Sequence, residues 1–190
     1  MRDIAFIGVD PGKSGFITID IDGSFIFIPM PEHKVETGKT LKSGKPQMKT
    51  AFNELGMRDI VLQIKEICKG RDIKVAIEEV GGRGGWSATN NFNFGYTAGL
   101  QKMIFIMLQA EITMVRPQKW QSFIRQGYPN IKKSSSTGKT MISDPKAVAK
   151  LIVDTEFPDI DFRKTERSKV DDDNKIDSFL VCQYLKRSYE

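Results

Sequence analysis

The segment IAFIGVDPGKSG, residues 4–15, carries the strongest structural signal in the chain. Residues 4–9 form a short, almost continuous apolar run, which predicts a strand buried on both faces. Asp10-Pro11-Gly12 then ends the run with a turn. A carboxylate that closes a buried strand is costly unless it is paired or binds a cation, although strand ends also meet solvent. Asp10 is therefore a candidate functional residue.

The segments that follow predict an α/β fold. Residues 15–21 and 25–28 have the pattern of strands, and Asp22-Gly23 between them is typical of a tight hairpin turn. Further strands are expected at residues 73–77 and 112–115. Helices are expected at residues 52–68, 88–110, 117–124, 143–154 and 172–187. Antiparallel strands followed by strand–helix alternation indicate a mixed five-stranded sheet with helices on both faces.

Two basic segments have no clear periodicity and are expected to be loops. The first, at about residues 30–50, has five lysines with several glycines and prolines, and we expect a long mobile loop there. It is either a solvated insertion or a DNA contact, because flexible lysines release counterions when they bind a phosphate backbone. The second, at about residues 127–142, is basic and rich in serine.

Length and composition limit which kinds of protein the chain can be. The 190 residues suffice for a single domain, expected to span 1–190, and 39% hydrophobic residues argue against disorder. A net charge of +5 favours an anionic partner. Cys68 and Cys182 lie in apolar helical stretches and are expected to be buried free thiols, too few for a cysteine zinc site. The sequence shows no signal peptide or membrane-spanning segment, so a soluble cytoplasmic protein is expected.

More acids occupy comparable positions further along the chain. Glu78 closes the strand expected at residues 73–77. Asp171, Asp172 and Asp173 open the last helix, where capping and the helix dipole explain acids without any function. Asp177 does not fit that explanation, because it lies one turn inside the helix. Asp173 and Asp177 share a helix face and repel each other unless a cation lies nearby. Carboxylates meeting in space would suit Mg²⁺, which prefers oxygen ligands.

Three motifs together give a family resemblance. IGVDPGKSG (residues 7–15), AIEEV (76–80) and DNKIDSFL (173–180) resemble, in order and spacing, the acidic motifs of RuvC-type Holliday junction resolvases in the RNase H-like superfamily. The likeness extends over nearly the whole chain and points to the phage type, which implies debranching of viral DNA before packaging. It implies an RNase H-like fold with the acids gathered at one edge.

The resemblance also implies a catalytic set. Asp10 takes the position of the first acid, Glu78 the second and Asp177 the last. The third is Asp173, because a three-residue spacing would require an acid where Asn174 stands. Glu79 is expected on the opposite side of the strand or outside the direct ligands. The four acids would hold two Mg²⁺ ions, with Mn²⁺ as a substitute, for phosphodiester hydrolysis without a covalent intermediate.

Basic and polar residues around these acids are candidates for DNA contact. Residues 116–150 contain eight lysine and arginine residues against Asp144 alone, more positive than the whole chain. Lys119 or Lys146 is expected to neutralise charge at the scissile phosphate. Some family members place an aromatic wedge three residues after the second acid, but Gly81 stands there, so Trp86 or Arg83 replaces the wedge or it is absent. The candidate DNA-binding residues are Lys13, Arg83, Trp86, Asn90, Asn91, Arg116, Lys119, Lys132, Lys133 and Lys146.

The resemblance further implies a homodimer acting on branched DNA, since a four-way junction needs paired symmetric cuts. Small and apolar residues of the helix at 88–110 form either core or a dimer seam. Other functions stay open: an RNase H-type enzyme on RNA–DNA hybrids, and a non-catalytic module that binds branched DNA. An ATP-binding protein of the actin–hexokinase type is disfavoured, because no second phosphate loop is found.

Overall fold

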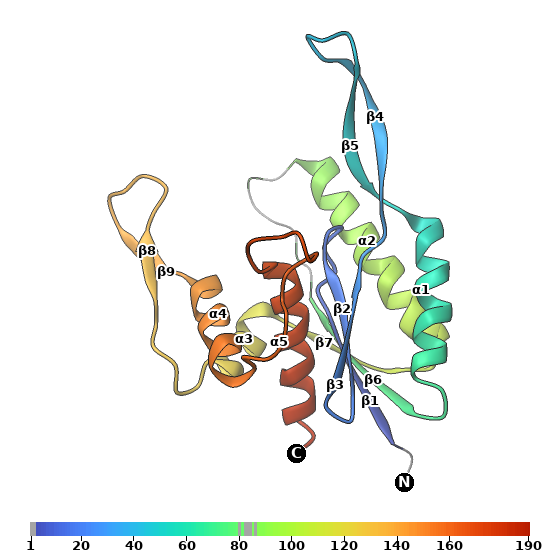
Figure 1. Ribbon diagram of the computed structural model, residues 1–190, viewed down its shortest axis with the longest axis vertical. Coiled ribbons are helices and arrows are strands. Elements are labelled where there is room, and N and C mark those ends of the chain that lie inside the picture. The colour runs from blue at the N-terminus through green and yellow to red at the C-terminus, as the bar shows by residue number, and fades with distance from the viewer. Residues whose placement is uncertain (1–2, 80, 82–84, 86) are drawn as a thin grey trace.

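The central sheet is mixed and five-stranded, as the sequence predicts. The structure is a computed structural model that describes residues 3–79, 81, 85 and 87–190 (Figure 1). The strand order is β3-β2-β1-β6-β7, with β2 antiparallel to its neighbours β1 and β3, and with β1, β6 and β7 parallel. The strands are β1 (Ile4–Val9), β2 (Phe16–Ile21), β3 (Ser24–Pro29), β6 (Asp72–Glu78) and β7 (Glu111–Val115).

The apolar run of β1 places that strand at the centre of the sheet. Ile7 pairs with Ile19 of β2 on one side and with Val75 of β6 on the other. The tight turn expected between β2 and β3 is present, since Asp22 and Gly23 have φ values of 53° and 87°. Two consecutive positive φ angles are what a two-residue hairpin needs to match the strand twist.

Helices cover both faces of the sheet, which confirms the predicted fold class (Figure 1). On one face, Met57, Ile60 and Ile64 of α1 and Ile104 and Phe105 of α2 join the core. On the other face, α3, α4 and α5 form a second core around Trp120 and Phe179. The helices are α1 (Glu54–Ile67), α2 (Ala88–Met107), α3 (Pro117–Ile124), α4 (Pro145–Glu156) and α5 (Asp173–Arg187).

Helix α5 lies directly on β1 because Gly8 has no side chain. A Cβ atom at Gly8 would lie 2.2 Å from the carbonyl oxygen of Ser178 and 2.3 Å from the backbone nitrogen of Cys182. Asp172 caps the helix by accepting hydrogen bonds from the backbone N–H groups of Asn174 and Lys175. This close packing fixes the start of α5 beside the end of β1.

The two basic segments are hairpins, so the prediction of loops was wrong. The first consists of β4 (Glu32–Thr40) and β5 (Pro46–Phe52), and the second of β8 (Lys132–Ser134) and β9 (Met141–Ser143). Both stand outside the main sheet. Each turn has a glycine with positive φ, Gly44 in one and Gly138 in the other. Lysines and glycines obscured the strand signal, because these ribbons bury little and show no apolar alternation.

In the part of the chain that the structure describes, no helix is both long and apolar enough to cross a membrane.

Candidate active site

The predicted acids are brought to one edge of the sheet by three elements. Val9 and Ile77 are in register in the parallel strands β1 and β6, so Asp10 and Glu78 follow at neighbouring strand ends. Asp177 comes from the first turns of α5, which the contact at Gly8 holds against β1. Asp173 lies one turn earlier on the same helix, at its first residue.

The electrostatics of Asp177 link it to the other acids. Burial, followed by the charges of Asp10 and Glu78, raises the pKa of Asp177 to about 7, while the charge of Lys146 opposes the shift. Asp173 adds a smaller contribution in the same direction as the other acids. A cluster of this kind has an excess of negative charge that a cation would relieve.

Each of the other acids is held by its own donor. The backbone N–H of Gly12 donates to Oδ1 of Asp10 at 3.1 Å. The indole Nε1 of Trp120 donates to Oε2 of Glu78 at 2.9 Å. The ammonium group of Lys146 forms an ion pair with Asp173, and this bond raises the pKa of Lys146, as do the nearby charges of Asp177 and Asp10.

The donor set fits a divalent cation chemically. Four carboxylates offer hard oxygen ligands, and one of them is mostly buried among the others. Among residues 3–79, 81, 85 and 87–190, no three carboxylate, imidazole or thiol groups are grouped closely enough to hold one ion. The donors of Gly12, Trp120 and Lys146 hold three of the acids separately, and the Lys146 ammonium supplies positive charge within the cluster.

Three side chains that sequence reasoning missed position the site. Trp120 is 2% exposed and reaches Glu78 from the second core. Gln101 of α2 is fully buried and its Nε2 donates to the carbonyl of Pro11 at 3.1 Å. The amide of Asn174 donates to the carbonyl of Ser14 at 3.2 Å, so it ties α5 to the turn after Asp10. No spacing rule points to these contacts, because each joins segments far apart in the sequence.

Glu79, the residue after Glu78, has a basic partner of its own. Its carboxylate forms an ion pair with Arg116 at 3.2 Å between Nε and Oε2. Arg116, a predicted DNA-binding residue, is thus engaged at the rim of the site. The predicted contacts Arg83 and Trp86 lie outside the described residues.

The remaining predicted DNA contacts fall into two groups. Lys13 lies in the turn after Asp10 and donates to the carbonyl of Thr50, while Asn90 and Asn91 lie in the first turn of α2. Lys132 and Lys133 belong to β8, where Lys133 pairs with Asp144 at 3.2 Å. The structure places these residues on separate elements and does not bring them together.

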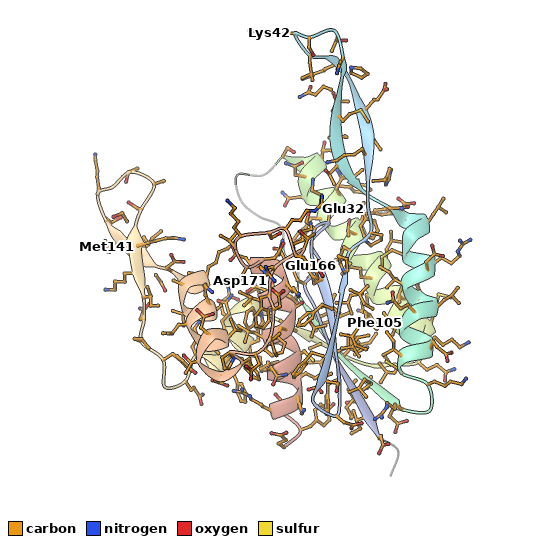
Figure 2. The ribbon with its side chains drawn as sticks, viewed as in Figure 1. Glu32, Lys42, Phe105, Met141, Glu166 and Asp171 are labelled. Atoms are coloured by element: carbon orange, nitrogen blue, oxygen red, sulfur yellow. The ribbon has the colours of Figure 1, made fainter. Side chains whose placement is uncertain are left out.

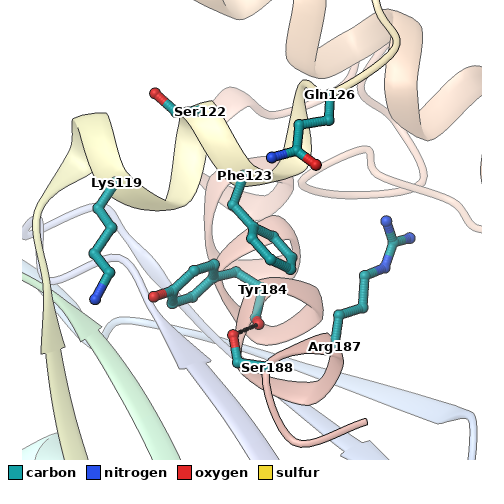
Figure 3. A pocket seen from close by; sticks show the side chains of 7 residues that line it. All are labelled: Lys119, Ser122, Phe123, Gln126, Tyr184, Arg187 and Ser188. Atoms are coloured by element: carbon teal, nitrogen blue, oxygen red, sulfur yellow. Dashed lines mark hydrogen bonds between the residues drawn. The ribbon is translucent and has the colours of Figure 1, made fainter.

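Of the two lysines expected to assist at the phosphate, the structure brings Lys146 to the acids. Lys119 instead lines a shallow groove between α3 and the C-terminal half of α5 (Figure 3). The groove is lined by Lys119, Ser122, Phe123, Gln126, Tyr184, Arg187 and Ser188.

Comparison with solved structures identifies the fold. A structure of T. thermophilus RuvC in complex with a Holliday junction substrate matches with a TM-score of 0.50 at 9% identity, covering 99% of this chain and 96% of the other. The chain has a RuvC-like fold. A second Thermus thermophilus RuvC structure matches with a TM-score of 0.49 at 13% identity, covering 100% and 97% of the two chains. No protein-family model and no curated protein matches the sequence.

The RuvC-like fold agrees with the RNase H-like architecture that the three motifs predict. At this level of identity the likeness concerns the fold alone, so the activity rests on the residues of the site.

Proposed function

We propose that the protein is a metal-dependent endonuclease that hydrolyses phosphodiester bonds in branched DNA, four-way junctions included. The observation that carries this proposal is the gathering of Asp10, Glu78, Asp173 and Asp177 at one edge of a RuvC-like sheet. A partly buried acid whose pKa is raised by burial and by neighbouring carboxylates is typical of a functional site.

In this proposal the four acids hold two Mg²⁺ ions, and Mn²⁺ substitutes for them. When bound, such ions activate water and stabilise the leaving oxygen. The chain itself supplies the frame: Gly12 and Trp120 orient Asp10 and Glu78, and Gln101 and Asn174 fix the turn from Pro11 to Ser14. A site held at several points keeps its ligands in place without reorganisation.

Lys146 contributes a positive charge at the site. It is half-exposed, and its ammonium group is paired with Asp173. We propose that it contacts the scissile phosphate, where a lysine acts as a mobile point charge. Lys13, Arg116, Lys132 and Lys133 would contact the flanking phosphates, which together make DNA binding sensitive to salt.

We further propose that the protein acts as a homodimer through α2. The solvent face of this helix has an apolar stripe between Phe92 and Met107, while Gln101, Ile104 and Phe105 are buried. Gly95 and Gly99 leave open space on the exposed side. The stripe consists of Phe92, Tyr96, Met103, Ile106 and Met107. A second copy of α2 would cover it and supply the two-fold symmetry that paired cuts need.

Both cysteines are free and buried in the structure. We place the protein in the cytoplasm, the host cytoplasm if it is of phage origin, where thiols stay reduced.

The central test is cleavage by the purified protein with Mg²⁺ or Mn²⁺ on four-way, three-way, flap and linear DNA. We expect cutting near the branch points and little cutting of linear duplex. Equal cutting of branched DNA and linear duplex would show that the enzyme does not select branched DNA. Preferred cutting of an RNA–DNA hybrid would favour an RNase H-type activity, and binding to junctions without cutting would indicate a non-catalytic module.

The first prediction concerns Asp10. We expect Asp10→Asn to abolish cleavage and to leave junction binding intact, because the change removes a charge but keeps the size and the hydrogen bond from Gly12. Cleavage and gel-shift assays on the same four-way junction measure the two effects. Asp59→Asn on the exposed face of α1 is the matched control. Mg²⁺-dependent cutting by the Asp10 variant would contradict the assignment.

A further inference from the structure

The hairpin of β4 and β5 is a basic ribbon that stands clear of the body (Figures 1 and 2). Residues 37–53 contain no acid and four lysines, all of them exposed at Lys39, Lys42, Lys45 and Lys49. Within the described part of the chain none of these four has an ion-pair partner. A solvated surface usually mixes charges of both signs, so this composition favours a polyanionic partner.

The base of the ribbon is anchored at the candidate active site. The hydroxyl of Ser14 is hydrogen-bonded to Glu32, and Nζ of Lys13 donates to the carbonyl of Thr50 at 3.4 Å. The backbone N–H of Asn53 donates to the carbonyl of Pro31 at 2.8 Å and closes the base. The ribbon therefore starts beside the turn that follows Asp10.

The dimensions of the ribbon match a DNA duplex. The nine residues of β4, at a rise of about 3.3 Å each, extend about 25–30 Å from the base to the turn near Lys42. At 3.4 Å per base pair this reach corresponds to about eight base pairs. A two-stranded ribbon is also narrow enough to approach a duplex along its major groove.

We propose that this hairpin binds the phosphate backbone of one duplex arm of the branched substrate, about eight base pairs from the cleavage site. The inference rests on the proposed function, because it assigns the ribbon a duplex that also reaches the acids. The tip lysines add affinity without regard to sequence, since phosphate contacts carry no base information. They take no part in the chemistry.

The test compares two variants that each remove two exposed lysines. Lys42→Gln/Lys45→Gln changes the tip of the ribbon, and Lys65→Gln/Lys69→Gln changes the last turn of α1 and the turn that follows it as a control. Junction binding is measured against salt in buffer without divalent cations. Each lost phosphate contact reduces the steepness of log K against log salt by about 0.9. When the salt rises from about 50 to about 200 mM, the fold-decrease in affinity should therefore be about ten times smaller for the tip variant than for the wild type.

Hydroxyl-radical footprinting locates the contact. We expect the wild type and the control to protect backbone positions about eight base pairs from the cut, and the tip variant to lose that protection alone. Cleavage of a saturated junction should be unchanged. Unchanged salt slope and footprint in the tip variant overturn the inference and leave the endonuclease intact, whereas a wild type that binds no branched DNA overturns both.

Discussion

At the residue scale, the candidate site holds a carboxyl, that of Asp177, where its ionised form is destabilised. Asp177 is mostly buried among Asp10, Glu78 and Asp173, and its pKa is raised to about 7. Folding therefore holds this carboxyl in a place that favours its neutral form. Between the unfolded pKa of 3.8 and a folded pKa of about 7, the native state binds more protons than the unfolded state. The contribution of Asp177 to the stability of the metal-free protein therefore falls as the pH rises through this window.

The direction of this pH dependence gives a second prediction. Asp177→Asn removes the charge, so it should stabilise the metal-free protein at pH 8 by up to about 4 kcal/mol, at 1.36 kcal/mol for each pKa unit. At pH 5 the wild-type carboxyl is already neutral, and the gain should be small. Urea unfolding at both pH values measures the difference. A gain that is equal at pH 5 and pH 8 would show that the charge is not its source.

The third prediction concerns Trp120, which donates a hydrogen bond to Glu78 and which we propose as a positioning residue for that carboxylate. Trp120→Phe keeps most of the buried ring but removes the hydrogen bond to the carboxylate. Hydrogen bonds to charged groups contribute about 1.5–3 kcal/mol, so we expect kcat to fall by about tenfold or more. The junction Kd should stay the same. Tyr128→Phe, which removes a bond to Glu156 elsewhere, is the control. A change in Kd with unaltered kcat would contradict the role.

At the element scale, α2 connects two features of the molecule. Its buried face carries Gln101, which holds the turn beside Asp10, and its exposed face carries the apolar stripe. A partner that covers the stripe would therefore pack against the same helix that holds the turn after Asp10. Tyr96 also donates to Glu54 of α1 at 3.0 Å, which fixes the stripe relative to the neighbouring helix.

The fourth prediction tests the proposed homodimer through α2. Met103 is 53% exposed on α2 and Leu62 is 60% exposed on α1. We expect Met103→Glu to give a monomer in light scattering, because it buries a charge in the apolar seam, and Leu62→Glu to leave the dimer intact. The monomer should nick junctions rather than make paired cuts. A wild-type protein that is monomeric at assay concentrations would contradict the seam.

The sequence foretold most elements of the sheet and its helices but missed both hairpins. Periodicity identifies elements that bury a face, and β1, α3 and α5 all do so. The ribbons β4–β5 and β8–β9 bury little, so their lysines and glycines gave no apolar pattern. Asp10, Glu78 and Asp173 could be placed because each ends or begins an element, and Asp177 could be placed because it lies one turn inside the same helix as Asp173. Their partners Trp120 and Gln101 could not, since those contacts depend on tertiary packing.

At the scale of the whole molecule, the proposed function gives the sheet edge and the basic hairpins separate tasks. The acids lie at the edge of the main sheet, and the lysines of the β4–β5 ribbon are carried away from it (Figure 2). Charge loss at the tip should thus alter affinity and salt dependence, while charge loss at Asp10 should alter cleavage. The different readouts make the two parts separable by experiment.

The close contact of α5 with Gly8 has a consequence for the time course of synthesis. The first acid is encoded near the start of the chain and the last in its final helix, and the two meet only when α5 lies on β1. A growing chain can pair β1, β2 and β3 early, yet it lacks Asp173 and Asp177 until the last helix has left the ribosome. The nascent protein is therefore unable to assemble the acid set before α5 has been made and has packed on β1, and an intermediate that holds only β1, β2 and β3 carries Asp10 without Asp173 or Asp177.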